Sequence, residues 1–484
     1  MTSLITLNLA FGVLIVSWFN PLSILQFLIV EFVNLAIAFD VSTCLTSLLV
    51  GRNLPPKLNK LARNPKVAIL YCTCNDVMPA LLRALRYQPY DVFVLDDSYL
   101  PEYKDEVGEI CRECGFKLVR RGSRRGFKAG ALNHWLRKYG NNYEYFVVLD
   151  SDSIIGRDFV EEMLKYAEHP LNRKVAVFQS KVMVWNRGSK FVRALSALFP
   201  VGYYFLERCG NPCDMMFSYG HNVLYRVSDL RRVGGFDERY ISEDVATSMN
   251  LLREGHLTRL VDVVSYEFSP DTPNKYVKRV IKWAKNTLQL SGKMAEGLPF
   301  TTLLAIFNVF LNYIIWFLYL AGMIIAVWGY TSSVRQAVGF ITFLMAGGFL
   351  WGDLLPRLLL IAFYLSHQLL FKLPFAVINK VKIRDYFEHI VLRIALSFYV
   401  MFPLIIAQAK AMLLRERHVF TITEKGGKRG IKFSELIKEM KYTLFLSAVL
   451  AIGSVRNPLS LVLNFAWLIP LFLSPLILYL YVKD

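Results

Sequence analysis

The sequence predicts an α/β domain, built on a doubly wound and mostly parallel sheet, that is inserted in a helical transmembrane domain. Between residues 65 and 270, short valine-rich apolar runs alternate with stretches of helical length, an order that is typical of βαβ units. Outside this region, long apolar runs carry few charged side chains, and apolar runs of about 18 residues or more are typical of transmembrane helices.

Composition supports a membrane region and narrows the range of partners. Of the 484 residues, 54% are hydrophobic and only 19% are charged, which is more apolar than an ordinary soluble domain. The formal net charge is +18. Because this excess accompanies membrane segments, we expect anionic membrane lipids and phosphorylated substrates as partners, and no nucleic acid.

The cysteines allow two interpretations. The chain has seven cysteines, with a C-x-x-C at residues 111–114 and a C-x-x-x-C at residues 209–213. Two such pairs could form a zinc site. Because no histidine or second C-x-x-C supports that site, we expect free thiols in a reducing cytosol.

The N-terminal part predicts a membrane anchor and a cytosolic exit. Residues 1–50 have the length and composition of two transmembrane helices, broken near residues 20–21. A cleaved signal peptide is the alternative, but no basic segment precedes the apolar run. Basic residues follow at 52–63, so the positive-inside rule places the domain at residues 51–300 in the cytosol.

Residues 301–484 predict further transmembrane helices, beginning with a span at 302–329. A basic loop near 415–441 must share the cytosol with the α/β domain if it covers a ligand there. In one topology, residues 335–378 cross once and residues 387–414 form an interfacial helix. In the other, residues 335–378 cross twice and 387–414 cross as well. Scattered charges within 387–414 suit the interfacial helix better.

The five predicted strands cover residues 66–72, 91–98, 116–121, 145–150 and 174–179. Polar side chains follow three of these strands. Ligands in open α/β sheets bind outside the carboxyl ends of the strands. Asp150 and Asp152 follow the fourth strand, and two carboxylates at this spacing can hold a divalent cation that takes other ligands from substrate phosphates. The alternative is a solvated loop that caps the next helix.

Three further segments carry groups suited to chemistry, and each has a plainer interpretation. A basic, glycine-containing stretch at 120–130 precedes a predicted helix at 129–139; it suits a phosphate chain or is a basic surface loop. Glu243 and Asp244 lie at the start of a predicted helix. They could provide a general base, or they could simply form an acidic N-terminal cap. Arg279 to Trp283 lie on a basic amphipathic helix that could also anchor at the membrane surface.

Taken in order, these motifs resemble the processive membrane family 2 glycosyltransferases, that is, the cellulose, mannan and hyaluronan synthases. The resemblance covers most of residues 66–430. It rests on D-D at 96–97, K-A-G-A-L-N at 128–133, D-S-D at 150–152, S-E-D at 242–244, R-V-I-K-W at 279–283 and F-T-I-T-E-K at 420–425. Two departures stand out: Lys282 replaces an arginine and so loses its planar fork, and Q-S-K at 179–181 replaces the usual Q-T-P.

The resemblance implies a cytosolic domain of glycosyltransferase-A type and an inverting, metal-dependent hexosyltransferase. Asp244 would be the catalytic base, Asp150 and Asp152 would hold Mg²⁺ or Mn²⁺, and Glu243 and Trp283 would contact the acceptor. The nucleotide-diphosphate sugar would be bound by Thr73, Asn75, Asp96, Asp97, Lys128, Gly130, Asp150, Arg279, Lys282 and Trp283, and a gating loop would contain Phe420, Ile422, Thr423 and Lys425.

The predicted function is polymerisation of a polysaccharide, with translocation of the product, by a multi-pass protein of the plasma membrane. The growing glycan would be the acceptor. The alternative is a single transfer to a membrane lipid. A transporter that uses Asp353 and Arg357 within its apolar segments is a third interpretation, but it leaves the strand-end aspartates unexplained. The resemblance also favours the topology with an interfacial helix at 387–414.

Overall fold

The computed structural model describes residues 43–291, 297–298, 302–303, 371–413, 431–455 and 458–483. Nearly all of the predicted span at 302–329, nearly all of the two spans before residue 50 and all of the gating-loop residues 420–425 therefore lie outside the described residues. The domain limits proposed from the sequence stay predictions.

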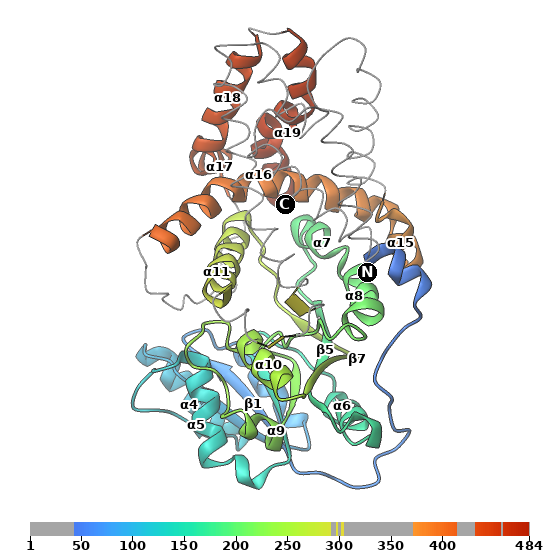
Figure 1. Ribbon diagram of the computed structural model, residues 1–484. Helices are drawn as coiled ribbons and strands as arrows, with labels where there is room; N and C mark the ends of the chain where they lie inside the picture. Colours follow the sequence, from blue (N-terminus) through green and yellow to red (C-terminus); the bar gives the residue numbers. More distant parts are fainter. Residues whose placement is uncertain are drawn as a thin grey trace.

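A seven-stranded sheet forms the centre of the α/β domain, in the order β3-β2-β1-β4-β6-β5-β7 (Figure 1). The strands are β1 Val67–Thr73, β2 Asp91–Asp96, β3 Lys117–Val119, β4 Tyr145–Asp150, β5 Val175–Val184, β6 Val223–Arg226 and β7 Leu257–Glu267. Strands β3, β2, β1 and β4 are parallel, and β5 is parallel to β7. Strand β6 runs antiparallel to both of its neighbours, so the sheet is mixed, with a mostly parallel core.

Helices cover both faces of the sheet, as a doubly wound domain requires. The helices are α3 Pro79–Ala84, α4 Pro101–Cys114, α5 Phe127–Lys138, α6 Phe159–Ala167, α7 Lys190–Ser196, α8 Phe199–Phe205, α9 Val227–Arg232, α10 Glu243–Arg253, α11 Pro273–Ser291, α15 Leu373–Ile378, α16 Ile383–Leu413, α17 Phe433–Glu439, α18 Lys441–Val455 and α19 Pro458–Val482, with the π-helical turn η4 at Leu206–Gly210.

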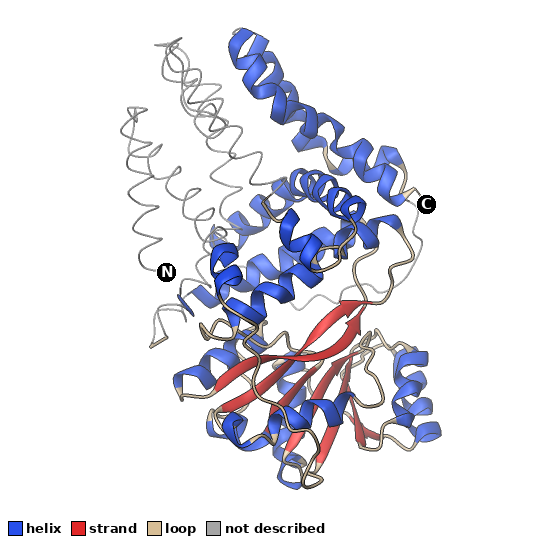
Figure 2. Cartoon of the chain, turned by 90° about the vertical axis from the view of Figure 1, so that its right-hand side faces the viewer, coloured by secondary structure: helices blue, strands red, loops and turns tan. Residues whose placement is uncertain are grey.

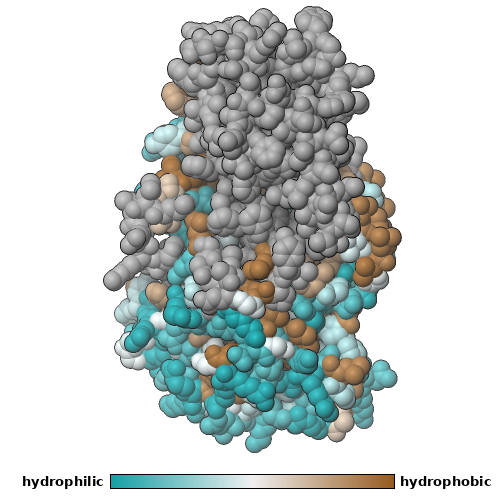
Figure 3. Space-filling model, viewed as in Figure 1, coloured by the Kyte–Doolittle hydropathy of each residue, from teal (hydrophilic) through white to brown (hydrophobic). Residues whose placement is uncertain are grey.

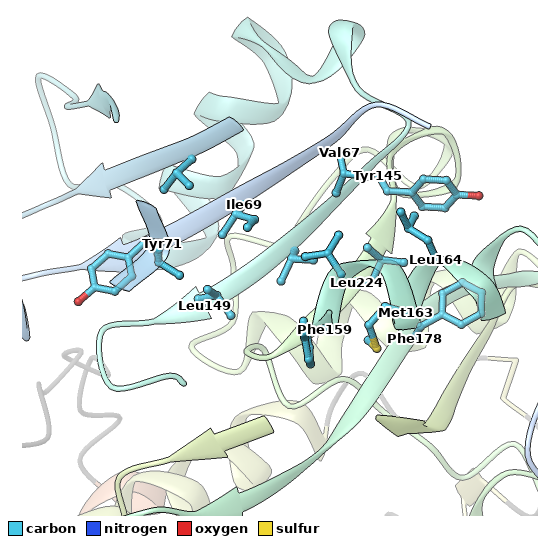
Figure 4. Packing of buried hydrophobic residues seen from close by; sticks show 14 of the residues in the cluster. Val67, Ile69, Tyr71, Tyr145, Leu149, Phe159, Met163, Leu164, Phe178 and Leu224 are labelled. Carbon is cyan, nitrogen blue, oxygen red and sulfur yellow. The ribbon is translucent and has the colours of Figure 1, made fainter. Parts of the chain in front are cut away.

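Alternate residues of the central strands feed two separate cores, because successive side chains of a strand point to opposite faces. Ile69 and Val147 pack with α4 and α6 on one face. Figure 4 shows Ile69 and Leu149 of this cluster with Phe159 and Met163 of α6. Leu70 and Val148 pack with α5 and α9 on the other face. Burial on both faces explains why these strands are continuous apolar runs in the sequence.

All five strands expected from the sequence are present, and two more were not expected. Strand β6 is only four residues long, and β7 alternates buried and exposed residues along its second half. Strand β5 continues to Val184, beyond the expected end. All seven cysteines are free thiols, and the described part of the chain has no cluster of three or more potential metal ligands.

The C-terminal helices lie against the α/β domain through α11. Helix α16 runs across the space between the sheet domain and helices α18 and α19 (Figures 1 and 2). Val277 and Ala284 of α11 share a buried cluster with residues of α16, α18 and α19. The face of the sheet domain is mostly hydrophilic, and apolar residues gather near the junction with these helices (Figure 3).

Among the described residues, α16 contains the one segment, Ile383–Ala411, whose length and apolar composition would allow it to cross a membrane. A long apolar helix of this kind also occurs in the core of soluble proteins, and 56% of its most apolar window is buried. Whether α16 lies at an interface or crosses therefore stays a prediction.

Trp135 is the largest fully buried side chain in the part of the chain that the structure describes, and its loss should destabilise the sheet domain. Its ring lies 5.6 Å from Phe93 and 5.2 Å from Phe146. Truncating such a residue to alanine costs about 3–5 kcal/mol, so Trp135→Ala should lower the midpoint of thermal unfolding in detergent by roughly 10 °C. Trp135→Phe should cost less, because the indole nitrogen has no hydrogen-bond partner within the described structure. A control, Tyr87→Ala at a site 62% exposed, should leave the midpoint nearly unchanged; equal shifts for all three variants would contradict this packing.

Candidate active site

A cavity of about 830 Å³ opens at the carboxyl ends of β1, β2 and β4. Its walls come from these strand ends, from helices α5, α8, α10 and α11, and from the segment 215–221. Ten of the residues predicted from the sequence line this one cavity: Thr73, Asp97, Lys128, Asp150, Asp152, Glu243, Asp244, Arg279, Lys282 and Trp283. Asn75, Asp96 and Gly130 lie next to it without lining it, and their direct contact with a nucleotide stays a prediction.

The two aspartates at the end of β2 are paired with arginines of the basic stretch. Arg120 Nε donates to Asp96 Oδ2 at 2.7 Å, and the Asp96 side chain is fully buried. Arg121 donates to both carboxylate oxygens of Asp97. From the sequence, the basic stretch suits a phosphate chain or forms a basic surface loop. In the structure its first two arginines pair with the strand-end carboxylates, and a phosphate role for the stretch stays a prediction.

Asn75 and Gly130 shape the loops around the cavity. Asn75 has a left-handed backbone conformation, with φ of +52°, and its Oδ1 accepts hydrogen bonds from the amides of Tyr99 and Leu100 at 2.9 and 3.1 Å. At Gly130 a Cβ atom would collide with the carbonyl oxygen of Arg125. Glycine therefore allows α5 to lie directly against the basic stretch.

Lys128 joins three parts of the site. Its ammonium group forms an ion pair with Asp150 and donates to the carbonyl oxygen of Gly220 at 2.9 Å. Burial alone would lower the pKa of Lys128, but the carboxylates of Asp150 and Glu243 outweigh burial and raise this pKa above its usual value. Lys128 is therefore a permanent cation at the end of β4.

Glu243 and Asp244 form an acidic pair at the start of α10. Burial, followed by the charge of Asp244, raises the pKa of Glu243 to about 7. Burial also raises the pKa of Asp244, against the opposing effects of the Val245 amide and Lys128. The Val245 amide donates to Asp244 Oδ1 at 2.8 Å. A raised pKa makes a carboxylate a better proton acceptor, as a general base requires.

Gly220 fits closely against this pair. Its φ is +78°, and a Cβ atom there would lie 2.9 Å from Asp244 Oδ2. The same residue offers its carbonyl to Lys128. Gly220 thus lets a single turn contact both the cation of α5 and the acid of α10.

His221 and Glu267 are site residues that the sequence did not reveal. His221 Nε2 lies 3.0 Å from Glu267 Oε2, and its Nδ1 lies 4.0 Å from Asp150 Oδ2. Arg279 Nη2 donates to Glu267 Oε1 at 2.9 Å, and its guanidinium stacks 4.6 Å from the Trp283 ring centre. The pKa of His221 rises to about 9 because Glu267 and Asp150 outweigh burial. Glu267 is the last residue of strand β7. That strand was not predicted from the sequence, so the position of Glu267 at a strand end could not be recognised.

The donor atoms fit a divalent cation that is shared with a substrate. Asp150 faces the cavity and is 36% exposed at its side chain, whereas Asp152 is buried and accepts from the Phe268 amide at 3.2 Å. Carboxylate oxygens are ligands for Mg²⁺ and Mn²⁺. Because the described residues hold no cluster of three protein ligands, phosphate oxygens and water would have to complete the coordination.

Residues 145–377, which include β4 to β7 and much of the cavity lining, match the family model described as Glycosyl transferase family group 2. The resemblance inferred from the sequence motifs is thereby confirmed.

Curated relatives are similar at low identity. Glucans biosynthesis glucosyltransferase H of Pseudomonas aeruginosa (strain UCBPP-PA14) is 24% identical over 265 residues, 47% of this chain and 30% of the relative. Probable glucomannan 4-beta-mannosyltransferase 7 of Oryza sativa subsp. japonica is 27% identical over 213 residues, 42% of this chain and 36% of the relative. Cellulose synthase catalytic subunit (UDP-forming) of Komagataeibacter sucrofermentans is 24% identical over 209 residues, 41% of this chain and 26% of the relative. The chain thus spans about a third or less of the length of these relatives.

Among solved structures, the mannosyltransferase PcManGT from Pyrobaculum calidifontis, in complex with GDP-Man and Mn²⁺, superposes with a TM-score of 0.48 at 18% identity, covering 79% of this chain and 99% of that chain.

The contact between Gly220 and Asp244 can be tested by adding one methyl group. Gly220→Ala should push the Asp244 carboxylate from its position. If Asp244 is the predicted base, this should lower sugar transfer roughly 10- to 100-fold, because small displacements of a catalytic group are costly. Gly234→Ala is the matched control, since Gly234 has a φ of +83° but nothing within 4 Å of the added Cβ. Both variants carry the same backbone strain. Equal rates for both, measured with a radiolabelled donor, would mean that the contact is irrelevant to catalysis.

Proposed function

We propose that this chain is a membrane-embedded, metal-dependent and inverting hexosyltransferase that uses a nucleotide-diphosphate sugar. The observation that carries the proposal is the meeting, in one cavity, of an acid with a raised pKa, Asp244, and the strand-end pair Asp150 and Asp152. The family 2 domain match supports a transferase.

The donor would bind at the ends of β1, β2 and β4. Thr73 and Asp97 lie where the nucleoside would enter, and Lys128 lies beside Asp150. The leaving diphosphate needs neutralisation by fixed positive charge. Asp150 and Asp152 would hold Mg²⁺ or Mn²⁺, which supplies electrophilic charge to the diphosphate when bound. Lys128 and Lys282 would add ammonium groups on the same side.

Asp244 would take the proton from the acceptor hydroxyl. Attack from the face opposite the leaving group would invert the anomeric centre in one displacement. Glu243 and Trp283 would orient the acceptor, since both line the cavity beside Asp244. The buried Gly220 contact would keep Asp244 in place while the hydroxyl approaches.

The finer proposal is that the acceptor is a growing polysaccharide, which the protein also translocates across the plasma membrane. The names of the relatives, which concern glucan, glucomannan and cellulose synthesis, support this direction. A gating loop with Phe420, Ile422, Thr423 and Lys425 would suit repeated turnover. The α/β domain and this loop would face the cytosol, with α16 at the membrane interface. Incubating the purified protein with a panel of radiolabelled nucleotide sugars and sizing the product tests polymerisation directly.

A second candidate acceptor is a membrane lipid. It is favoured by the apolar side chains that α8 and the segment after it give to the cavity, such as Phe199, Leu206 and Phe217. The two candidates share the donor site and the catalytic base.

Replacing the proposed base should abolish sugar transfer and leave binding of the donor intact. Asp244→Asn should lower the rate of sugar transfer by about 10²–10⁴-fold, the usual contribution of general-base catalysis. Binding of nucleotide diphosphate, measured by calorimetry, should stay nearly unchanged because the base acts on the acceptor proton. Glu102→Gln, which also removes a carboxylate from the first turn of a helix, is the control for a mere capping effect. A near-normal rate for Asp244→Asn would leave Asp244 as a helix cap only.

Transfer should depend strictly on Mg²⁺ or Mn²⁺. Excess chelator should stop turnover, and adding back either ion should restore it, because two carboxylates and the substrate phosphates form a hard oxygen site. Asp152→Asn should weaken binding of Mn²⁺ in the presence of nucleotide diphosphate, measured by electron paramagnetic resonance. Full turnover in chelator would refute the metal assignment.

A further inference from the structure

We infer that Gln289 is a positioning residue for sugar transfer, because its side chain ties the loop that leads to Asp244 to the helix that would hold the acceptor. This inference rests on the proposed function, since it concerns the alignment of the proposed base in the same site. The loop, called the base loop here, comprises residues 233–242 and connects α9 to α10. It lies outside the described helices and strands, so its backbone depends on other partners for hydrogen bonds.

The first half of the base loop is fixed by α5. Asn133 Oδ1 accepts from the Phe236 amide at 2.8 Å, and Asn133 Nδ2 donates to the Phe236 carbonyl at 2.9 Å. The same nitrogen donates to Glu238 Oε1 at 2.8 Å, and Asn133 is buried. Helix α5 also carries Lys128, so the donor side of the site and the start of the base loop depend on one helix.

The second half of the base loop is fixed by α11. Gln289 Nε2 donates to the Arg239 carbonyl at 3.1 Å, and Gln289 Oε1 accepts from the Ile241 amide at 3.4 Å. A single side-chain amide thus bonds both a donor and an acceptor of the loop backbone. Ile241 lines the cavity and lies close before Asp244 in the chain, so this contact acts directly beside the proposed base.

The helix that carries Gln289 also faces the acceptor side of the cavity. Lys282, Asn286 and Gln289 have the spacing i, i+4, i+7, which places them on one face of α11. Lys282, Trp283 and Asn286 line the cavity, and Trp283 is the residue proposed to orient the acceptor. One side chain therefore joins the loop that leads to the base and the helix that would hold the acceptor.

This link would set the distance between the base and the acceptor hydroxyl. A general base must lie within about 2.6–3.2 Å of the oxygen that it deprotonates, and a displacement of about 1 Å can lower a rate roughly 100-fold. Without the link, the base loop and α11 can move apart, and Asp244 would separate from an acceptor that α11 holds. Water is small and mobile, so it can still reach the displaced base.

Loss of the link should therefore change the products as well as the rate. In hydrolysis of the donor, a water oxygen bonds to the anomeric carbon while the bond to the diphosphate breaks. Nucleotide diphosphate leaves, the water proton passes to Asp244, and free sugar results. A glutamine with only a structural role would affect transfer and hydrolysis alike, because both need the bound donor. A positioning glutamine would affect transfer much more.

The experiment uses Gln289→Met, which keeps the size and helix propensity of the side chain and removes both hydrogen bonds. Membrane vesicles containing the full chain receive radiolabelled UDP-glucose and the other nucleotide sugars of the same panel, and the label is separated into transferred product and free sugar. Transfer should fall roughly 10- to 100-fold, and the ratio of free sugar to product should rise at least about tenfold.

Gln88→Met is the matched control for the loss of a glutamine hydrogen bond. Gln88 also donates to a loop carbonyl, that of Gly156 at 3.0 Å, and neither residue lines the cavity. This variant should leave both the transfer rate and the product ratio unchanged. An unchanged product ratio in Gln289→Met would overturn the inference.

A second comparison tests whether Gln289 acts through Asp244. In an Asp244→Asn background, Gln289→Met should cause less than about a twofold further loss of transfer, because a base that has been removed cannot be misplaced. Equal losses in the wild-type and Asp244→Asn backgrounds would mean that Gln289 acts independently of the base, and would also overturn the inference.

Nucleotide binding separates this inference from the proposed function. Binding of UDP and GDP, measured by calorimetry, should be the same in wild type, Gln289→Met and Gln88→Met, since the donor side is held by α5. A loss of binding in Gln289→Met alone would assign Gln289 a structural role and overturn the inference. A near-normal rate for Asp244→Asn would instead overturn the proposed base, and a wild-type protein that binds neither nucleotide would overturn the proposed function.

Discussion

The ammonium group of Lys128 is the contact on which the rest of the site depends. It lies between the carboxylate of Asp150 and the carbonyl of Gly220, so it joins β4, α5 and the turn before β6. Without this cation, the carboxyl groups of Asp150, Glu243 and Asp244 would meet at the same end of the sheet, with Glu243 buried and Asp150 partly exposed. Carboxylates so close together disfavour one another's charge, and the ammonium group offsets that effect before a substrate arrives. The sugar donor would thus meet a centre whose charges are already in place.

A second set of ion pairs secures the helix that closes the cavity. Glu267, at the end of β7, accepts from Arg279 of α11 and lies beside His221. The opposite face of α11 packs on α16, where Arg393 donates to the hydroxyl of Tyr276. Helix α11 is therefore held from the sheet on one side and from the C-terminal helices on the other. This double attachment offers a physical route by which the C-terminal helices could influence Trp283 and the acceptor side of the site.

The sequence was sufficient for the central strands and for the acids and lysine that follow them. Strands β1, β2 and β4 are buried and parallel, so they appear as continuous apolar runs, and side chains after such runs fall at one edge of the sheet. Strands β6 and β7 lack that signal, because β6 is very short and β7 is partly exposed. His221 and Glu267 were missed for the same reason, since their importance arises from a contact between residues 46 positions apart. The pairing of Arg120 with Asp96 likewise depends on the folded distance and not on motif spacing.

The cavity has a charged side at the strand ends and an apolar side at α8, and this difference bears on the chemistry that the site can perform. On the donor side, strand ends provide acids and cations that suit a diphosphate, and fixed charges of this kind stabilise a leaving group without reorganisation. On the other side, α8 presents hydrocarbon, and the hydroxyl of Tyr203 is bound by the backbone of Val182. Asp244 lies in the lining common to both sides, held by Gly220 and the amide of Val245. If Asp244 acts as the base of the proposed transfer, its position between the two sides lets it meet an acceptor hydroxyl, while the apolar side keeps water, the competing nucleophile, away from the activated sugar.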